Sequence, residues 1–216
     1  MPGLAGSARR ISHLIWRLYA PAGWRGRVFA YGRTLLCPFE RILPQAPHRG
    51  RFIEIGCGTG VLANLLALSG EGRQVMGYDA SPKAIAVAQA TVGKRSNISF
   101  QVARVENLGA LEPADAVAAV DLFHHLDATT QLRVIDWVGR TLKTGGVFLL
   151  KEIDRHPTWM YLANKLHDAI MDRRNPLCVR PSDEYLRLLA TAGFEVSFEP
   201  MHKLVYPHVF FLARKR

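Results

Sequence analysis

A strand-like run that ends in a cluster of glycines is the sequence feature that most constrains the fold of this chain. Residues 52–60 read Phe-Ile-Glu-Ile-Gly-Cys-Gly-Thr-Gly, and a nearly all-apolar helical stretch follows at residues 61–68. Glycine allows the backbone to turn tightly and to approach a ligand closely. In an open parallel sheet, such a turn lies at the carboxyl edge, where nucleotides bind. The segment therefore predicts a nucleotide site on a parallel α/β sheet.

Short apolar runs alternate with helical patterns in the middle of the chain. Strands are expected at residues 52–55, 74–78, 98–103, 116–120 and 147–150. One helix is expected to begin at Ser81–Pro82 and another after Asp127, with Gly145 and Gly146 ending the second. Nearly continuous apolar strands separated by helices are typical of a parallel sheet that is covered on both faces.

The C-terminal part follows a different pattern. Helices are expected at residues 157–173 and from Ser182, as its N-terminal cap, to a point before Gly193. Strands at residues 194–198 and 205–213 follow each other without a helix between them. Two such strands predict an antiparallel hairpin that completes the sheet.

The first 44 residues are expected to form a separate basic helical arm or lid, followed by one domain at residues 45–216. Residues 1–39 contain six arginines and no acidic residue, whereas the whole chain has a net charge of +10. Two helices are expected, broken near residues 21–23, and the second, at about residues 25–39, is apolar and basic. Aromatic residues alternate with arginines along the arm. One interpretation is that the arm binds an acidic partner, namely a phosphorylated substrate, an acidic carrier protein, an anionic membrane surface or nucleic acid. The other is that its charge only keeps the protein soluble.

Composition excludes several other classes of protein. A chain of 216 residues with 49% hydrophobic and 21% charged residues fits one ordinary globular core rather than a disordered chain. No run of about 18 apolar residues predicts a membrane span. The three cysteines are far apart and predict neither a disulfide framework nor a zinc site, so we expect a cytoplasmic protein without a metal.

Details of the glycine turn identify the kind of nucleotide. A dinucleotide fingerprint would need glycine where Val61 stands, and a P-loop would need a lysine that is absent. Asp79, which closes the second strand, can accept hydrogen bonds from both hydroxyls of an unphosphorylated ribose. Glu54 would repel a pyrophosphate but can hold a cationic amino group. A nucleoside with a positive tail and no phosphate, such as S-adenosylmethionine, fits these residues.

With these residues the chain resembles the class I, Rossmann-like S-adenosylmethionine-dependent methyltransferases over about residues 50–154. The resemblance implies a three-layer α/β sandwich with a mostly parallel seven-stranded sheet and an antiparallel C-terminal hairpin. It also implies that Asp79 binds the ribose and that Ala80 lies along the adenine. The remaining cofactor-binding residues that it implies are Glu54, Gly56, Cys57, Gly58, Gly60, Arg104, Val105 and Asp121, with Glu106 as an alternative to Arg104 at the adenine.

Residues that could act on the methyl acceptor follow the fourth and fifth strands. The segment 120–126, Val-Asp-Leu-Phe-His-His-Leu, resembles the family's fourth motif, and His124 and His125 are candidate bases near neutral pH. One histidine of such a pair can instead pack or cap a turn. Glu152 and Asp154 are expected either at the acceptor pocket or in an exposed loop. Polar residues of the following helix, which are further candidates, are Tyr161, Asn164, His167 and Asp168.

These observations predict an S-adenosylmethionine-dependent methyltransferase acting on a small acceptor that is hydrophobic or carrier-linked. Oxygen or carbon is favoured over nitrogen, because the Asn/Asp-Pro-Pro-aromatic run typical of base-amine methylation is absent. The arm is expected first as a lid, then as a membrane-surface contact and last as an RNA contact. Two alternatives stay open: an RNA-directed methyltransferase that uses the arm, and a protein that binds S-adenosylmethionine without methylating.

Overall fold

Seven strands form one sheet in the order β3-β2-β1-β4-β5-β7-β6 in the computed structural model, which describes residues 7–154, 178–201 and 207–216. Strands β1 to β5 are parallel, and β7 runs antiparallel to both β5 and β6. The predicted α/β class with its reversed C-terminal hairpin is therefore confirmed. The strands are β1 (Gly50–Ile55), β2 (Arg73–Asp79), β3 (Ile98–Val102), β4 (Ala114–Val120), β5 (Leu142–Ile153), β6 (Phe194–Pro200) and β7 (His208–Lys215).

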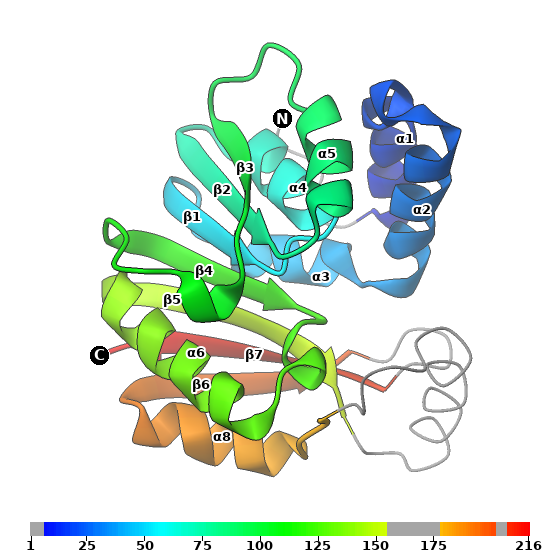
Figure 1. Ribbon diagram of the computed structural model, residues 1–216. Coiled ribbons are helices and arrows are strands. Elements are labelled where there is room, and N and C mark those ends of the chain that lie inside the picture. The colour runs from blue at the N-terminus through cyan, green and yellow to red at the C-terminus, as the bar shows by residue number, and fades with distance from the viewer. Residues whose placement is uncertain (1–6, 155–177, 202–206) are drawn as a thin grey trace.

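Helices cover both faces of this sheet (Figure 1). On one face, α4 (Val61–Ser69) and α5 (Pro82–Ala90) share a buried apolar cluster with Phe52, Val75 and Leu149 of the strands. On the other face, α6 (Ala128–Thr141) and α8 (Ser182–Thr191) pack on a second cluster that includes Ile53 and Phe148. Successive residues of a strand point to opposite faces, so Phe52 and Ile53 enter different clusters. The result is three layers.

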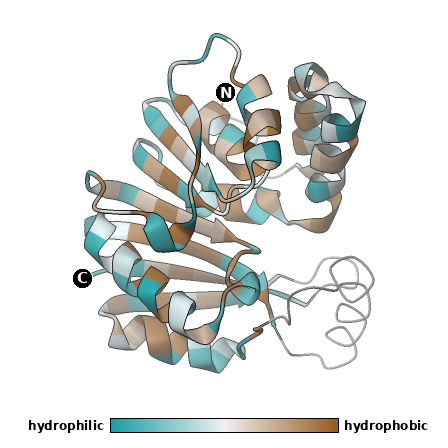
Figure 2. Ribbon diagram, viewed as in Figure 1, coloured by the Kyte–Doolittle hydropathy of each residue, from teal (hydrophilic) through white to brown (hydrophobic). Residues whose placement is uncertain are grey.

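The central strands owe their burial to almost uninterrupted apolar runs, which Figure 2 shows as mostly brown ribbons at the centre of the sheet. In β4, six of the seven residues are buried, and only Asp115 is partly exposed. A strand that is buried on both faces needs this composition, unlike a strand with one face in water. The order of the strands reverses between β1 and β4, because β2 lies beside β1 on one side and β4 on the other. A crevice at this point is where ligands of open α/β sheets bind.

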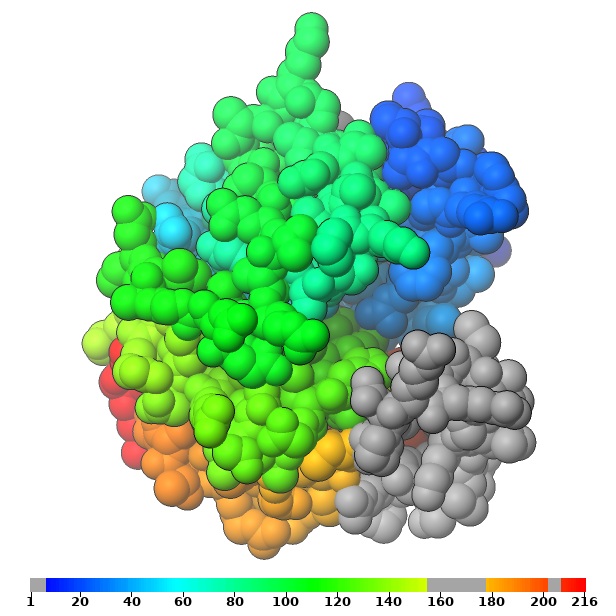
Figure 3. Space-filling view, in the orientation of Figure 1, coloured from blue at the N-terminus to red at the C-terminus, as the bar shows by residue number. Residues whose placement is uncertain are grey.

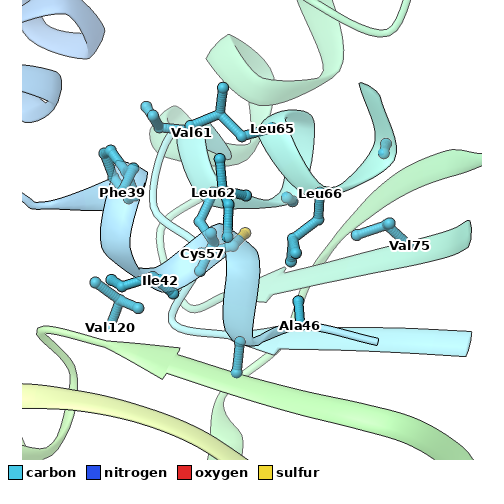
Figure 4. Close-up of a cluster of buried hydrophobic side chains, with 14 of the residues drawn as sticks. Phe39, Ile42, Ala46, Cys57, Val61, Leu62, Leu65, Leu66, Val75 and Val120 are labelled. Atoms are coloured by element: carbon cyan, nitrogen blue, oxygen red, sulfur yellow. The ribbon is translucent and has the colours of Figure 1, made fainter. Parts of the chain in front are cut away.

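The first helices lie beside α4 and α5 rather than across the sheet (Figure 1). They are α1 (Ala8–Leu18), the short 3₁₀ turn η1 (Ala20–Ala22), α2 (Gly23–Leu36) and α3 (Phe39–Ile42). Ile11 and Ile15 of α1 belong to the same buried cluster as α4. Figure 4 shows Phe39 of α3 beside Leu62 of α4. The arm is therefore packed onto the domain and continues its core.

Three predicted helix ends differ from the structure. The helix predicted at residues 25–39 ends at Leu36, because Cys37 is extended (φ −98°, ψ 132°) before Pro38, and a residue that precedes proline disfavours the helical region. Helix α6 ends at Thr141, and Gly145 and Gly146 lie inside β5, near the register shift between β4 and β5.

The third difference concerns Ser182. It is the first residue of α8 and not its cap, because the extended Pro181 (φ −62°, ψ 152°) occupies the capping position. The helix predicted at residues 157–173, with Tyr161, Asn164, His167 and Asp168, lies outside the described residues, as does part of the strand predicted at 205–213.

Candidate active site

A cavity of about 430 Å³ lies at the carboxyl ends of β1, β2 and β4. This is the point where the order of the strands reverses, so the topology alone explains its position. Four groups of residues line it: Glu54, Gly56, Cys57, Gly58, Thr59, Val61 and Leu62 around the glycine turn; Asp79; Val120, Asp121, Leu122, His124 and His125 after β4; and Phe29, Arg33, Leu36, Phe39, Ile153 and His208 from the remaining walls.

The glycine turn follows β1 with three left-handed residues, Gly56 (φ 65°), Gly58 (φ 54°) and Gly60 (φ 78°). A Cβ on Gly56 would lie 2.7 Å from the Leu122 side chain, and a Cβ on Gly60 would lie 2.6 Å from the Phe100 ring. A Cβ on Gly58 would meet nothing within 4 Å. The first and third glycines are thus required by packing within the protein, whereas the second leaves open space at the cavity wall.

Glu54 is buried at the end of β1 and lines the cavity. One of its oxygens, Oε2, accepts a hydrogen bond of 2.7 Å from the backbone N–H of Ala63. Burial raises the pKa of Glu54 to about 8, although the Ala63 N–H and the positive charge of Arg33 act in the opposite direction. The site therefore contains a buried acid that is ready to receive a cation.

Asp79 joins the ends of β1 and β2. Its Oδ2 accepts a hydrogen bond of 2.8 Å from the N–H of Gly58, and its Oδ1 accepts one of 2.8 Å from the N–H of Ser81. A carboxylate has about four acceptor positions, so each oxygen can still accept from a ligand hydroxyl. The partly exposed Asp79 thus orients the glycine turn and presents acceptor positions to the cavity.

His124 and Glu152 form a buried pair beneath the cavity. The Nδ1 atom of His124 lies 2.6 Å from Oε2 of Glu152. The other oxygen of Glu152 accepts hydrogen bonds from the backbone N–H groups of Leu122 (3.0 Å) and Phe123 (2.7 Å). Glu152 is completely buried, and His124 is 5% exposed and lines the cavity. Burial disfavours the imidazolium, but the ion pair and hydrogen bond with Glu152 outweigh it, and the pKa of His124 is raised.

A second buried charge group involves Asp121, which has a positive φ of 57°. The Nζ of the fully buried Lys151 and the guanidinium of Arg33, at 2.9 Å, both pair with its carboxylate. Despite burial, these two cations lower the pKa of Asp121 far below its usual range. Such backbone conformations cluster at functional sites. Arg33 belongs to α2, so this ion pair connects the arm to the end of β4.

Two further hydrogen bonds hold the arm over the site. The hydroxyl of Tyr19 donates to the carbonyl of Thr59 in the glycine turn, at 2.7 Å. His208 of β7 donates from Nε2 to the carbonyl of Leu36 in α2, at 3.1 Å. Tyr19 is buried, whereas three other aromatic residues of the arm, Trp16, Trp24 and Phe29, are exposed. The arm thus supplies part of the cavity wall and contacts the glycine turn directly.

A family model described as a methyltransferase domain matches residues 29–197, most of the chain. The chain belongs to this family. The matched segment is a methyltransferase domain, as the sequence predicts. The match begins inside α2, so it includes part of the segment that we assign to the arm.

Relatives and solved structures agree with this assignment. The methyltransferase is 30% identical, over 116 residues, to a ubiquinone biosynthesis O-methyltransferase of Xanthomonas campestris pv. campestris (strain B100), covering 52% of this chain and 47% of the relative. The chain thus spans about half the length of that curated relative. The magnesium protoporphyrin IX methyltransferase of Synechocystis PCC 6803, solved with bound SAH, has 17% identity and a TM-score of 0.68 over 94% of this chain and 93% of that chain.

A further solved structure shares the fold. The S-adenosylmethionine-dependent methyltransferase from Mesorhizobium loti has 19% identity and a TM-score of 0.67, over 81% of this chain and 96% of that chain. The residues of the cavity fit S-adenosylmethionine: Gly58 leaves room, Glu54 offers a buried acid for the amino group, and Asp79 offers acceptors for the ribose.

The structure brings together eight of the predicted site residues: Glu54, Gly56, Cys57, Gly58, Asp79, Asp121, His124 and His125 line the cavity. The other four do not line it, and these are Gly60, Ala80, Arg104 and Val105. Gly60 caps α4, Ala80 is exposed, and Val105 begins a 3₁₀ turn after β3. We expected Glu152 either in the acceptor pocket or in an exposed loop. It lies in neither place, because it is buried behind His124. His125 is exposed at the cavity rim, with its ring 4.2 Å from that of His124.

Sequence reasoning missed Lys151, Arg33 and His208 as residues of the site. Lys151 directly follows the apolar run 147–150 of β5, and a cation at the end of such a run signals a buried charge that needs a partner. No local signal could place Arg33 or His208, because both reach the site through tertiary packing.

Among the residues that the structure describes, no group of three histidine, cysteine or acidic side chains could hold a metal ion. None of the described helices is long and apolar enough to cross a membrane.

Proposed function

We propose that this methyltransferase methylates a hydroxyl oxygen of a small, largely apolar acceptor, with His124 as the general base. The observation that carries the proposal is the pair formed by His124 and Glu152 at the cavity wall, with 2.6 Å between Nδ1 and Oε2. A hydroxyl is a poor nucleophile unless a base removes its proton during the transfer, and histidine suits this role near neutral pH.

Glu152 is the residue that would orient the ring of His124 and fix the tautomer of its neutral form, and by raising the pKa of His124 it makes that form a stronger base. A carboxylate accepts hydrogen bonds, so the proton of the neutral imidazole lies on Nδ1, and Nε2 is left with a lone pair. The two backbone N–H groups that bind Glu152 keep its carboxylate in place. Bound S-adenosylmethionine supplies an electrophilic methyl group on its sulfonium, so His124 has only to receive the proton of the acceptor.

The apolar side chains of the cavity wall favour an apolar acceptor. Phe29, Leu36, Phe39, Val120 and Ile153 all line the cavity. Burial of an apolar surface against such side chains provides binding energy, at roughly 25 cal/mol per Å². Similarity to curated ubiquinone biosynthesis O-methyltransferases supports oxygen as the methylated atom and a small molecule as the acceptor.

Matched pairs of acceptors test the proposal. The protein would be incubated with S-adenosylmethionine carrying a labelled methyl group and with apolar phenols, the corresponding anilines, and structured RNA. We expect label in the phenols. The variant His124→Ala should lower kcat by about 10²- to 10⁴-fold and leave the affinity for S-adenosylhomocysteine nearly unchanged. The variant His125→Ala should have a smaller effect, because its ring lies exposed at the rim.

Two results would contradict the proposal. Label that enters only the anilines or the RNA would show that a hydroxyl is not the acceptor. A rate for His124→Ala that equals the wild-type rate would remove His124 as the base. In either case, S-adenosylhomocysteine binding measured by calorimetry would still report on the cofactor site.

A further inference from the structure

The outer face of α2 carries a stripe of exposed apolar side chains. Trp24 is 71% exposed, Val28 51% and Leu35 47%. Spacings of four and seven residues place these three on one side of the helix. The buried residues of α2, which are Gly26, Ala30 and Thr34, lie on its opposite side. Of the eight large apolar side chains that are exposed in the described part of the chain, five belong to α1 and α2.

The same surface is strongly positive. Residues 1–39 include six arginines and no carboxylate, and four of these arginines, Arg9, Arg10, Arg17 and Arg25, are exposed. In Figure 3, the atoms of α1 and α2 (blue) form one edge of the molecule beside α5. We call this surface, made of the exposed residues of α1 and α2, the arm face. It combines a wide apolar stripe with positive charge and has no acidic residue to offset that charge.

A groove of about 570 Å³ between α1 and α2 extends the arm face. Trp16, Tyr31 and Leu35 supply apolar side chains to it, and Arg9 and His13 supply polar ones. The rings of Trp16 and Tyr31 pack edge to face at 5.5 Å, and the guanidinium of Arg27 lies 4.0 Å above the Trp16 ring. The aromatic side chains are therefore held in place within the surface.

We propose that the arm face docks on the surface of an anionic phospholipid bilayer. Apolar side chains on one side of a helix enter the boundary between headgroups and acyl chains, and flanking arginines attract the anionic headgroups. Nucleic acid is a poorer match, because Val28 and Leu35 cannot stack on bases, whereas single-stranded nucleic acid needs aromatic platforms. Exposed aliphatic side chains between arginines suit a partner that is both negative and apolar.

This docking would place the cavity beside the lipid surface. Phe29, the residue after Val28, is 59% exposed and also lines the cavity, as does Arg33 one turn further along α2. An apolar acceptor dissolved in the bilayer could then reach the site without crossing bulk water. The docking itself does not depend on which acceptor or which atom is methylated.

Cosedimentation with vesicles tests the proposal on the full chain. Vesicles of phosphatidylglycerol with phosphatidylcholine would be compared with vesicles of phosphatidylcholine alone. We expect binding to the anionic vesicles only, with a blue shift in tryptophan fluorescence that is smaller in Trp24→Phe. The triple variant Trp24→Ser/Val28→Ser/Leu35→Ser should weaken vesicle binding about tenfold or more. The double variant Arg17→Gln/Arg25→Gln should weaken it to a similar extent.

Matched variants elsewhere on the surface serve as controls. Val102→Ser/Leu132→Ser/Phe198→Ser removes three exposed apolar side chains outside the arm face, and Arg140→Gln/Arg187→Gln removes two exposed charges. Both controls should bind anionic vesicles as the wild type does, and all variants should bind S-adenosylhomocysteine. Equal binding to both kinds of vesicle, or equal losses in the arm and control variants, would overturn the proposal. Binding of structured RNA through Arg17 and Arg25 without vesicle binding would overturn it as well.

Discussion

Oε2 of Glu152 lies 2.6 Å from Nδ1 of His124. Because Glu152 is completely buried, bulk water does not compete with His124 for its carboxylate. Burial disfavours the charged imidazole, but Glu152 outweighs this effect and raises the pKa of His124 above its ordinary value. In Glu152→Gln the burial remains while the negative charge is lost. We therefore predict that the pKa of His124 falls below its ordinary value in this variant. An NMR titration of the imidazole protons measures it; an unchanged pKa would contradict the assigned role of Glu152.

The hydrogen bonds of Asp79 with Gly58 and Ser81 lead to a prediction about cofactor binding. The variant Asp79→Ala should abolish detectable binding of S-adenosylhomocysteine in calorimetry, because the ribose loses its acceptors and the glycine turn loses its tether. Asp136→Ala, which removes an exposed carboxylate of α6, is the control and should bind normally. Equal affinity in wild type and Asp79→Ala would show that the ribose lies elsewhere.

Proton release provides a test of Glu54. Because burial raises its pKa to about 8, Glu54 is mostly protonated at pH 7. A bound ammonium group favours the carboxylate and lowers this pKa, so cofactor binding should release close to one proton at pH 7. Affinity should correspondingly rise as the pH increases toward 8. Calorimetry in buffers with different ionisation enthalpies measures the released proton. In Glu54→Gln this release should vanish; if it persists, another group receives the ammonium.

Alanine substitutions at two glycines of one turn should separate folding from binding. In Gly60→Ala, the new Cβ would meet Phe100 at 2.6 Å with a positive φ, so we predict a loss of about 2–4 kcal/mol in the free energy of unfolding. In Gly58→Ala, only the positive φ is unfavourable, at about 1 kcal/mol, but the methyl group occupies open space at the cavity wall. Gly58→Ala should therefore weaken cofactor binding more than stability.

Urea unfolding and calorimetry on both glycine variants provide the measurements. Should Gly58→Ala bind the cofactor with wild-type affinity, the open space beside Gly58 is not part of the cofactor site.

The sheet could be predicted from the sequence because short stretches of neighbouring residues specify its strands and turns. Each of the parallel strands contains a short apolar run with a turn at its end, and the glycines at 56–60 specify a turn that few other structures tolerate. The predicted helix ends were less accurate, because Gly145 and Gly146 resemble the residues that end a helix although they lie within β5. A glycine pair has several structural uses, and the strand beside it determines which one applies.

The site was predictable only where its residues follow directly on a strand. Asp79, Asp121 and His124 each lie at or just after the end of a parallel strand, so topology brings them to the cavity. The role of Glu152 depends on its burial behind His124, which the alternation of β5 does not reveal. Arg33 and Tyr19 come from the arm, 88 and 40 residues from their partners Asp121 and Thr59. Their side chains find these partners only after the chain has folded.

The position of β7 between β5 and β6 has a consequence for synthesis on the ribosome. One edge of β5 has no strand to pair with until residues 208–215 have left the exit tunnel, although β5 itself is translated more than fifty residues earlier. A nascent chain therefore exposes an unpaired apolar strand edge during that interval, and such edges promote aggregation. Ribosomal pausing in this interval would lengthen the exposure, so expression yield should depend on codon choice there.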